Sequence, residues 1–213
     1  MKKYELTAEF IEQWGKKLFR IKALISFGSV EAGELGGYVE KEDNLAQDGD
    51  AWVCDDARVC GDAWVYGNAR VYGNARVYGN ARVYGNAEVY GNARVYGNAR
   101  VYGNARVYGD AEVYGNAEVC GNAEVCGNAD YLLIGRIGSR FSFTTFFKNK
   151  DKGITVSCGC FLGTIAEFRA KVTDTHGNNK HAKMYNLAAD MAELQILGEE
   201  HFDKLNTNKS EPF

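Results

Sequence analysis

A six-residue word, Ala-x-Val-x-Gly-Asn, repeats almost without variation through the middle of the chain. Its alanines recur in steps of six from Ala51 to Ala129. Side chains alternate between the two faces of a strand, so Ala and Val share one face and the two variable residues share the other. Gly-Asn tolerates positive φ and makes a sharp corner. Each word therefore predicts a four-residue strand with an apolar inner face, followed by a corner.

The word is incompatible with a helix. Its apolar positions do not follow a 3.6-residue period, and a Gly in every word would cost about 1 kcal/mol each time. Three words instead close a triangular coil of 18 residues. Each strand then pairs in parallel with the strand 18 residues further on, about 4.8 Å away. Inward Val stacks on Val, and outward residues form files along the coil.

This pattern resembles the hexapeptide repeat of left-handed parallel β-helices. The segment from Leu18 to Val59, with "FGSVEAGELGGYV" and "LAQDGDAWV", resembles the start of the YdcK-like β-solenoid family. The resemblance implies a mainly β fold with a left-handed, triangular parallel β-helix. It also implies a homotrimer, as is typical of hexapeptide β-helices, and it carries over no activity.

Three segments are expected: an N-terminal cap (1–36), a β-solenoid (37–137) and a C-terminal α+β module (138–213). In and next to the cap we predict strands near Tyr4–Leu6 and Lys17–Leu24, with a helix near Ala8–Trp14 between them. An open solenoid end exposes strand edges and apolar interior, so the cap is expected to cover it.

The C-terminal module is predicted to have a ββαα order. Two strands are expected at Ser139–Phe147 and Ile154–Cys160. A capping box at Thr164–Glu167 begins a helix at Ile165–Thr175. A second helix is expected from Asn179 to Ile196. The segments "TTFF" and "GITVSCGCFLGT" look similar to C-terminal modules of uncharacterised phage and prophage proteins.

The outward files carry Tyr and charged side chains. Tyr is a good strand former that flattens a sheet face, and it is also enriched at subunit interfaces. Arg beside Tyr resembles a surface that holds phosphate and stacks rings. A purely structural role, a subunit interface and a ligand-binding surface therefore all stay open for these side chains. The candidate ligand or subunit-interface residues are Tyr72, Tyr90, Tyr108, Arg76, Arg94, Arg82 and Arg100 from the solenoid, and His176, Lys180 and His181 from the module.

Catalytic groups are sparse in the repeats. Many hexapeptide β-helix proteins are acyltransferases with a His base on a coil, but all three His lie late in this chain, at His176, His181 and His201. Cys158, Cys160, His176 and His181 have the residue types of a zinc site, although Cys-x-Cys within a strand is unlike the usual spacing. Buried Cys and loop His are the simpler interpretation. We expect no catalytic residue, no metal and no cofactor.

Composition and charge bear on the kind of partner and on the cellular location. The net charge of −3 argues against long nucleic acid, and no apolar run approaches the roughly 20 residues of a membrane span. Most of the six Cys occupy the position that Tyr occupies in other copies of the repeat. This favours reduced thiols, and therefore a protein located in the cytoplasm of a bacterial or phage-infected cell. The leading hypothesis is a non-catalytic homotrimeric scaffold that presents the module to a partner such as a host protein. The alternatives are a phage-type protein that binds or sequesters a small anionic, nucleotide-like ligand, and an acyltransferase.

Overall fold

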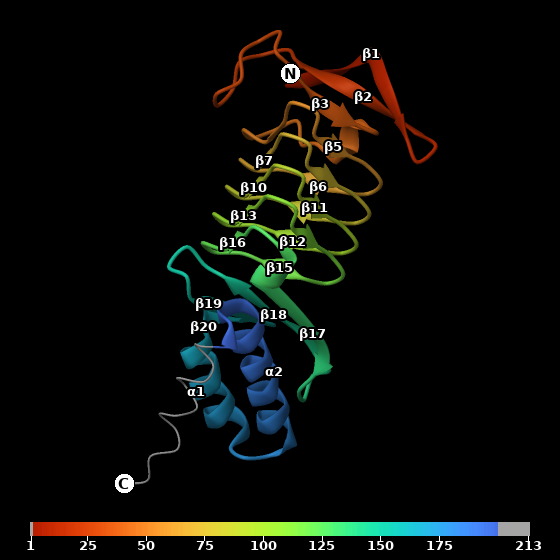
Figure 1. Ribbon diagram of the computed structural model, residues 1–213. Coiled ribbons are helices and arrows are strands. Elements are labelled where there is room, and N and C mark those ends of the chain that lie inside the picture. Colours follow the sequence, from red (N-terminus) through yellow and green to blue (C-terminus); the bar gives the residue numbers. More distant parts are fainter. Residues whose placement is uncertain (1, 200–213) are drawn as a thin grey trace. The chain divides into compact units, whose positions relative to one another are not determined.

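The computed structural model describes residues 2–199, which form two compact units (Figure 1). The first unit holds residues up to 122 together with 126–128, and the second holds 123–125 and residues from 129 onward. The end of the expected module, including His201, lies outside the described residues. Among residues 2–199, no helix is long and apolar enough to cross a membrane.

The repeats of the first unit form a coil with three walls. Each six-residue word contributes a hydrogen-bonded strand of only two residues, so the expected strand length of four residues is wrong. The two residues of each strand are the outward charged or Trp residue and the Val that follows it. The strands are β4 (Trp52–Val53), β5 (Arg58–Val59), β6 (Trp64–Val65), β7 (Arg70–Val71), β8 (Arg76–Val77), β9 (Arg82–Val83), β10 (Glu88–Val89), β11 (Arg94–Val95), β12 (Arg100–Val101), β13 (Arg106–Val107), β14 (Glu112–Val113) and β15 (Glu118–Val119).

Strands 18 residues apart are neighbours, as the word predicts. Val65 pairs with Val83 and Val83 with Val101 in one wall, all in parallel. The other walls follow β5-β8-β11-β14 and β4-β7-β10-β13. Backbone hydrogen bonds join successive coils throughout, for example from Tyr84 N to Val101 O at 3.0 Å. The triangular 18-residue register is therefore confirmed.

The inner faces of the walls form an apolar shaft. Every repeat Val from Val53 to Val119 and every repeat Ala from Ala51 to Ala117 is at most 1% exposed. Small, β-branched Val suits a strand, and Ala leaves room near the corners. This burial is the main stabilising contribution of the solenoid, about 25 cal/mol for each Å² of apolar surface removed from water.

The corners depend on Gly in the left-handed region. Gly85, for example, has φ +71°, and a Cβ there would lie 3.0 Å from the amide nitrogen of Gly103 in the next coil. The following Asn residues hydrogen-bond to one another along the corner, as Asn86 Nδ2 does to Asn104 Oδ1 at 3.1 Å. Gly-Asn thus both turns the chain and joins one coil to the next.

The N-terminal cap extends one wall of the solenoid. Strands β1 (Tyr4–Gln13) and β2 (Lys16–Ala23) form an antiparallel hairpin, and β2 pairs with β3 (Leu35–Val39). Strand β3 then pairs in parallel with β5. The resulting seven-stranded sheet has the order β1-β2-β3-β5-β8-β11-β14. A short 3-10 helix, η1 (Glu42–Asn44), follows β3.

The helix expected near Ala8–Trp14 is wrong, because those residues belong to β1 and its turn. Phe10 pairs with Phe19 and Ile11 with Leu18 across the hairpin. Trp14 and Gly15 both have positive φ, 51° and 73°. Two-residue loops with positive φ at both positions match the twist of a hairpin. The strand expected at Lys17–Leu24 is confirmed as β2.

Two buried side chains close the capped end of the shaft. Lys3 is 2% exposed, and its ammonium donates to the carbonyl oxygens of Asp48, Gly49 and Ala51 at 3.3, 3.3 and 2.9 Å. The Tyr4 hydroxyl contacts the carbonyl oxygens of Glu42 and Leu45, both at 2.8 Å. These side chains supply hydrogen-bond donors to backbone carbonyl oxygens at the capped end of the shaft.

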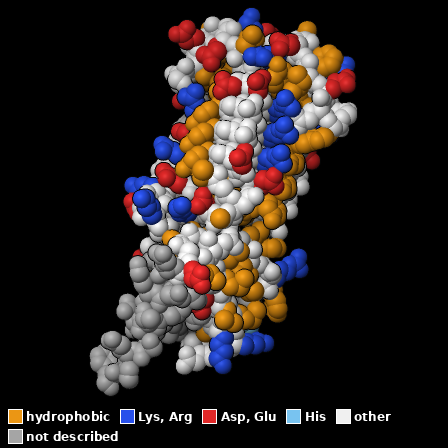
Figure 2. Space-filling view, in the orientation of Figure 1, with side chains coloured by type: hydrophobic (Ala, Val, Ile, Leu, Met, Phe, Trp, Pro, Cys, Tyr) orange, Lys and Arg blue, Asp and Glu red, His pale blue; other side chains and the backbone are white. Residues whose placement is uncertain are grey.

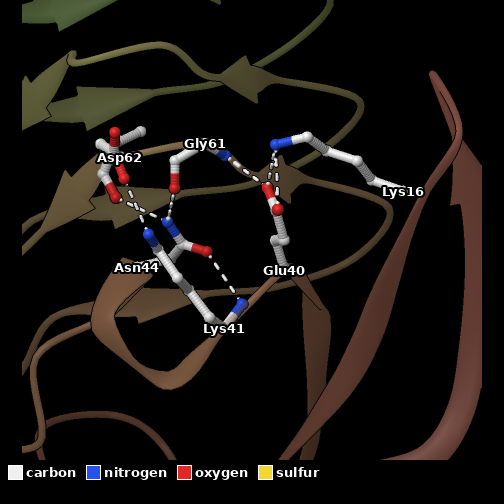
Figure 3. Close-up of polar contacts among 7 residues, drawn as sticks. Lys16, Glu40, Lys41, Asn44, Gly61 and Asp62 are labelled. Carbon is white, nitrogen blue, oxygen red and sulfur yellow. Dashed lines mark hydrogen bonds and ion pairs between the residues drawn. The ribbon is translucent and has the colours of Figure 1, made fainter.

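Figure 3 shows how the cap is joined to the first coil. The Asn44 amide, fully buried, donates to the carbonyl oxygens of Gly61 and Ala63 at 3.0 and 2.8 Å. The Glu40 carboxylate accepts from the amide of Gly61 at 2.6 Å and from the Lys16 ammonium. These contacts replace the Asn-to-Asn bonds of the regular corners.

The second unit is an antiparallel sheet with two helices. Strands β17 (Tyr131–Ile137), β18 (Ser142–Lys148), β19 (Ile154–Cys158) and β20 (Phe161–Thr164) pair in sequence order. Helices α1 (Ile165–His176) and α2 (Lys180–Leu197) bury apolar residues against Phe146 and Val156 of the sheet. The unit also contains β16 (Glu124–Val125), and a 3-10 turn, η2 (Asn128–Asp130), precedes β17.

The ββαα order expected for this module is incomplete, because the sheet has four strands. The two predicted strands and both helices are present, and the capping box at Thr164 is confirmed: Glu167 N–H donates to Thr164 Oγ1, and Thr164 N–H donates to Glu167 Oε2. Strands β17 and β20 were missed. Both are outer strands of the sheet, and each pairs with only one neighbour.

Candidate functional site

The outward Tyr residues of the solenoid stack in three continuous files. Tyr66, Tyr84 and Tyr102 have ring centroids 4.8 and 4.9 Å apart, with nearly parallel planes. The file predicted as an interface behaves in the same way, with Tyr72 and Tyr90 4.8 Å apart and Tyr90 and Tyr108 5.1 Å apart. These rings are half-buried by their neighbours in the same chain. Stacking alone therefore accounts for the Tyr files, and they do not require a subunit interface.

Charged side chains form files beside the Tyr residues, and Figure 2 shows one run of Lys or Arg side chains (blue) along the solenoid. Arg94 pairs in register with Arg76 on one side and Glu112 on the other. The Arg94 guanidinium lies 2.8 Å from the Glu112 carboxylate, and the equivalent distance from Arg100 to Glu118 is 3.2 Å. Exposed pairs of this kind contribute about 0–1 kcal/mol each. Arg76 and Arg94 lie on a different wall from Arg82 and Arg100, so the four do not form one site.

Burial shifts the pKa of several Tyr phenols in these files upward. Burial, together with the hydrogen bond that the Tyr96 hydroxyl makes with Glu112 at 3.1 Å, raises the pKa of Tyr96 to about 12. The pKa values of Tyr72, Tyr84 and Tyr102 are also raised, chiefly by burial. These four phenols are therefore neutral hydrogen-bonding groups at physiological pH.

This shift predicts alkaline unfolding. A group whose folded pKa exceeds its unfolded value contributes stability that is fully present below the unfolded pKa, 10.0 for Tyr, and is lost as the pH rises through the folded value. We expect the free energy of unfolding to fall between pH 10 and about pH 12. Phenolate absorbance should rise together with the loss of the far-ultraviolet circular dichroism signal. In Glu112→Gln, the Tyr96 pKa should move part of the way back toward 10. Phenols that all ionise near pH 10 in a still-folded protein would contradict this.

A pocket of about 350 Å³ lies within the C-terminal module. The β17–β18 turn supplies Arg140, the first residue of β20 is Phe161, and α1 supplies Phe168 and His176. The remaining lining residues are Ser139, Ser142, Cys158, Gly159, Lys171, Val172, Thr175 and Tyr185. Three basic side chains, those of Arg140, Lys171 and His176, thus line one cavity with aromatic rings. Among residues 2–199, no carboxylate lines it.

The wall of this pocket is held by the module's core. Phe168, Val172 and Tyr185 are all less than 10% exposed and pack in one cluster. The Phe168 ring meets those of Phe161 and Tyr185 at centroid distances of 5.6 Å in both cases. Burial, together with Cys158, raises the pKa of Tyr185 to about 12, so its phenol is neutral at physiological pH. The apolar part of the pocket is therefore preformed.

The predicted module residues are only partly brought together. His176 and Cys158 line the pocket, and the His176 ring lies 5.8 Å from Tyr185. His181 is next to His176, with ring centroids 5.8 Å apart, and its Nδ1 is buried without a hydrogen-bond partner. Lys180 and Cys160 are exposed and do not line the pocket. Within residues 2–199, no group of three or more His, Cys, Asp or Glu is placed to hold a metal, so the four zinc candidates do not form one site.

Sequence reasoning missed Arg140, Lys171 and Tyr185. They come from three elements separated along the chain, and no local motif marks them. The one signal available in the sequence was Arg140 in the short segment Gly138–Phe141 between two strands. That signal is weak without the fold.

The three-walled coil makes the repeat region a β-solenoid. Comparison with protein families gives it a narrower class: residues 63–76, 69–85, 75–89, 87–101 and 99–115 match the model described as YdcK Beta solenoid repeat. The repeats are accordingly YdcK-like. The match lies in the repeats, whereas the resemblance noted from sequence lay at Leu18–Val59. No curated protein matches the chain significantly. The likeness of the module to phage and prophage proteins stays a prediction.

Proposed function

We propose that this protein is a non-catalytic homotrimeric scaffold in which the solenoid is a rigid spacer and the C-terminal module is the binding part. The observation that carries the proposal is the unbroken 18-residue register. From β4 to β15, each word is hydrogen-bonded to words one coil away, and no inserted loop interrupts the walls. Inserted loops are where clefts and catalytic residues usually lie. An uninterrupted coil suits a spacer.

Self-association is supported by an apolar stripe on α2. Met184, Leu187, Met191 and Leu194 are 39%, 63%, 57% and 45% exposed. Their spacing of three, four and three residues places them on one helix face, as in the seam between helices of a coiled coil. Contiguous exposed apolar side chains are typical of association surfaces. We assign the stripe to contacts between copies of this chain.

Light scattering after size-exclusion chromatography tests this assignment. The wild type is expected at three times the mass of one chain, and Leu187→Gln/Met191→Gln is expected to be monomeric because it removes the two most exposed apolar side chains of the stripe. Lys183→Gln, exposed on the same helix, should remain trimeric. A wild type that is monomeric would contradict the trimer. A double variant that stays trimeric would exclude the stripe and leave the Tyr72, Tyr90 and Tyr108 file as the alternative contact.

The pocket in the module favours a second function, the binding or sequestering of a small anionic ligand. The observation behind it is the set of basic side chains at Arg140, Lys171 and His176, with no carboxylate among the described residues that line the pocket. Scaffold and ligand binding are compatible, since the spacer and the pocket belong to different units.

A further inference from the structure

The charge balance of the module pocket indicates the sign of its ligand. Among residues 2–199, Arg140 makes no ion pair with a carboxylate. Lys171 pairs with Asp174 at 3.2 Å, but both side chains are largely exposed, so the pair contributes little and exchanges readily with another anion. A guanidinium with free donors is the group that best recognises phosphate and carboxylate.

The apolar part of the pocket indicates a ring. Phe161, Phe168 and Val172 line it together with Tyr185, and aromatic side chains favour offset or edge contacts with another ring. The Tyr185 phenol and the Ser139 and Ser142 hydroxyls add neutral hydrogen-bonding groups. Small-molecule pockets combine such an apolar lining with a few polar groups that fix orientation.

The volume limits the size. About 350 Å³ lies near the lower end of the range for small-molecule sites, roughly 300–1,000 Å³. A single ring system with one charged group fits this space better than a dinucleotide or a peptide.

We propose that this pocket binds a small aromatic anion, a planar ring bearing a phosphate or carboxylate, with the ring against Phe161 and Phe168 and the charged group at Arg140. The inference rests on the proposal that the module is the binding part of the protein, and it adds the ligand class and the residues. Lys171 and His176 supply the remaining basic side chains around the charged group.

Isothermal titration calorimetry of the full chain with three matched probes tests the ligand class. Phenyl phosphate carries both the ring and the charge, inorganic phosphate carries only the charge, and benzyl alcohol carries only the ring. Phenyl phosphate is expected to bind at least tenfold more tightly than either partial probe. Equal binding of phenyl phosphate and inorganic phosphate, or no binding of any probe, would overturn the proposal. AMP, titrated alongside, separates nucleotides from smaller aromatic acids, and binding by either class supports the proposal.

Two variants assign the roles. Arg140→Ala, in an exposed turn, should weaken phenyl phosphate binding about tenfold or more, because a charge-assisted hydrogen bond is lost. Phe161→Leu should reduce the advantage of phenyl phosphate over inorganic phosphate. Lys150→Ala, an exposed cation of the β18–β19 turn outside the pocket lining, is the matched control and should bind like the wild type. Undiminished binding by Arg140→Ala would contradict the assignment. Loss of ligand binding leaves the molar mass unchanged, so failure here is distinct from failure of the trimer.

Discussion

Val83→Asp is expected to unfold at urea concentrations where the wild type and Arg82→Asp remain folded. Val83 is fully buried in the shaft between Val65 and Val101, whereas Arg82, the preceding residue of β9, is exposed. The same side chain is thus placed on the two faces of one strand. Losing the buried Val costs about 1.5–3 kcal/mol. An unpaired carboxylate in the dry shaft costs several kcal/mol more.

The combined cost of Val83→Asp is comparable with the whole free energy of unfolding of a typical domain, about 5–15 kcal/mol. Because each coil contacts only its neighbours, a break in the middle also deprives the coils on both sides of their partner. Arg82→Asp, by contrast, places an acid beside Arg100 on the outer face and should change the free energy of unfolding by less than about 1 kcal/mol. Urea titrations followed by far-ultraviolet circular dichroism measure the difference. Equal midpoints for the two variants would show that Val83 does not face a core.

The solenoid was predictable because each word experiences the same surroundings. Val in one coil packs on Val in the next, so the alternation of residues within one repeat also predicts which residues are in contact between coils. The pairing of Arg94 with Glu112, and the stacking of Tyr84 on Tyr66, follow from the period alone. The left-handedness of the coil does not follow from the repeat period. It is an expectation from the resemblance to left-handed parallel β-helices.

The cap and the module were harder to predict, because their strands depend on distant partners. Residues 8–13 form part of a strand because Phe10 and Ile11 pair with Phe19 and Leu18. The hairpin turn at Trp14–Gly15 lacks an Asn-Gly or Asp-Gly signature. Likewise, β17 is a strand by virtue of its pairing with β18. The helices were easier, because capping residues such as Thr164 act within one turn.

The candidate site was predictable only in part. His176 and Cys158 drew attention by residue type and do line the pocket. The predicted solenoid residues lie on three separate walls, so they do not converge. Arg140 and Tyr185 are 45 positions apart in the chain and meet only when the β17–β18 turn packs against α2. A convergence of this kind has no signature in a single sequence.

Disulfide trapping tests the threading of the solenoid most directly. In Arg82→Cys/Arg100→Cys, the two cysteines occupy registered residues of adjacent parallel strands. Strands are about 4.8 Å apart, within the Cα separation of roughly 4.4–6.8 Å that a disulfide requires. In Arg82→Cys/Arg94→Cys, the second cysteine is nearer in sequence but lies on another wall. A flexible chain would favour this nearer pair, since a shorter loop loses less entropy on closure.

Peptide mapping by mass spectrometry after mild oxidation identifies each linkage separately from the six native cysteines, none of which forms a disulfide in this structure. The predicted result is an intramolecular 82–100 disulfide in high yield and no 82–94 disulfide. Preferential trapping of 82 with 94, or equal yields from both variants, would contradict the 18-residue coil and, with it, the spacer proposed for this protein.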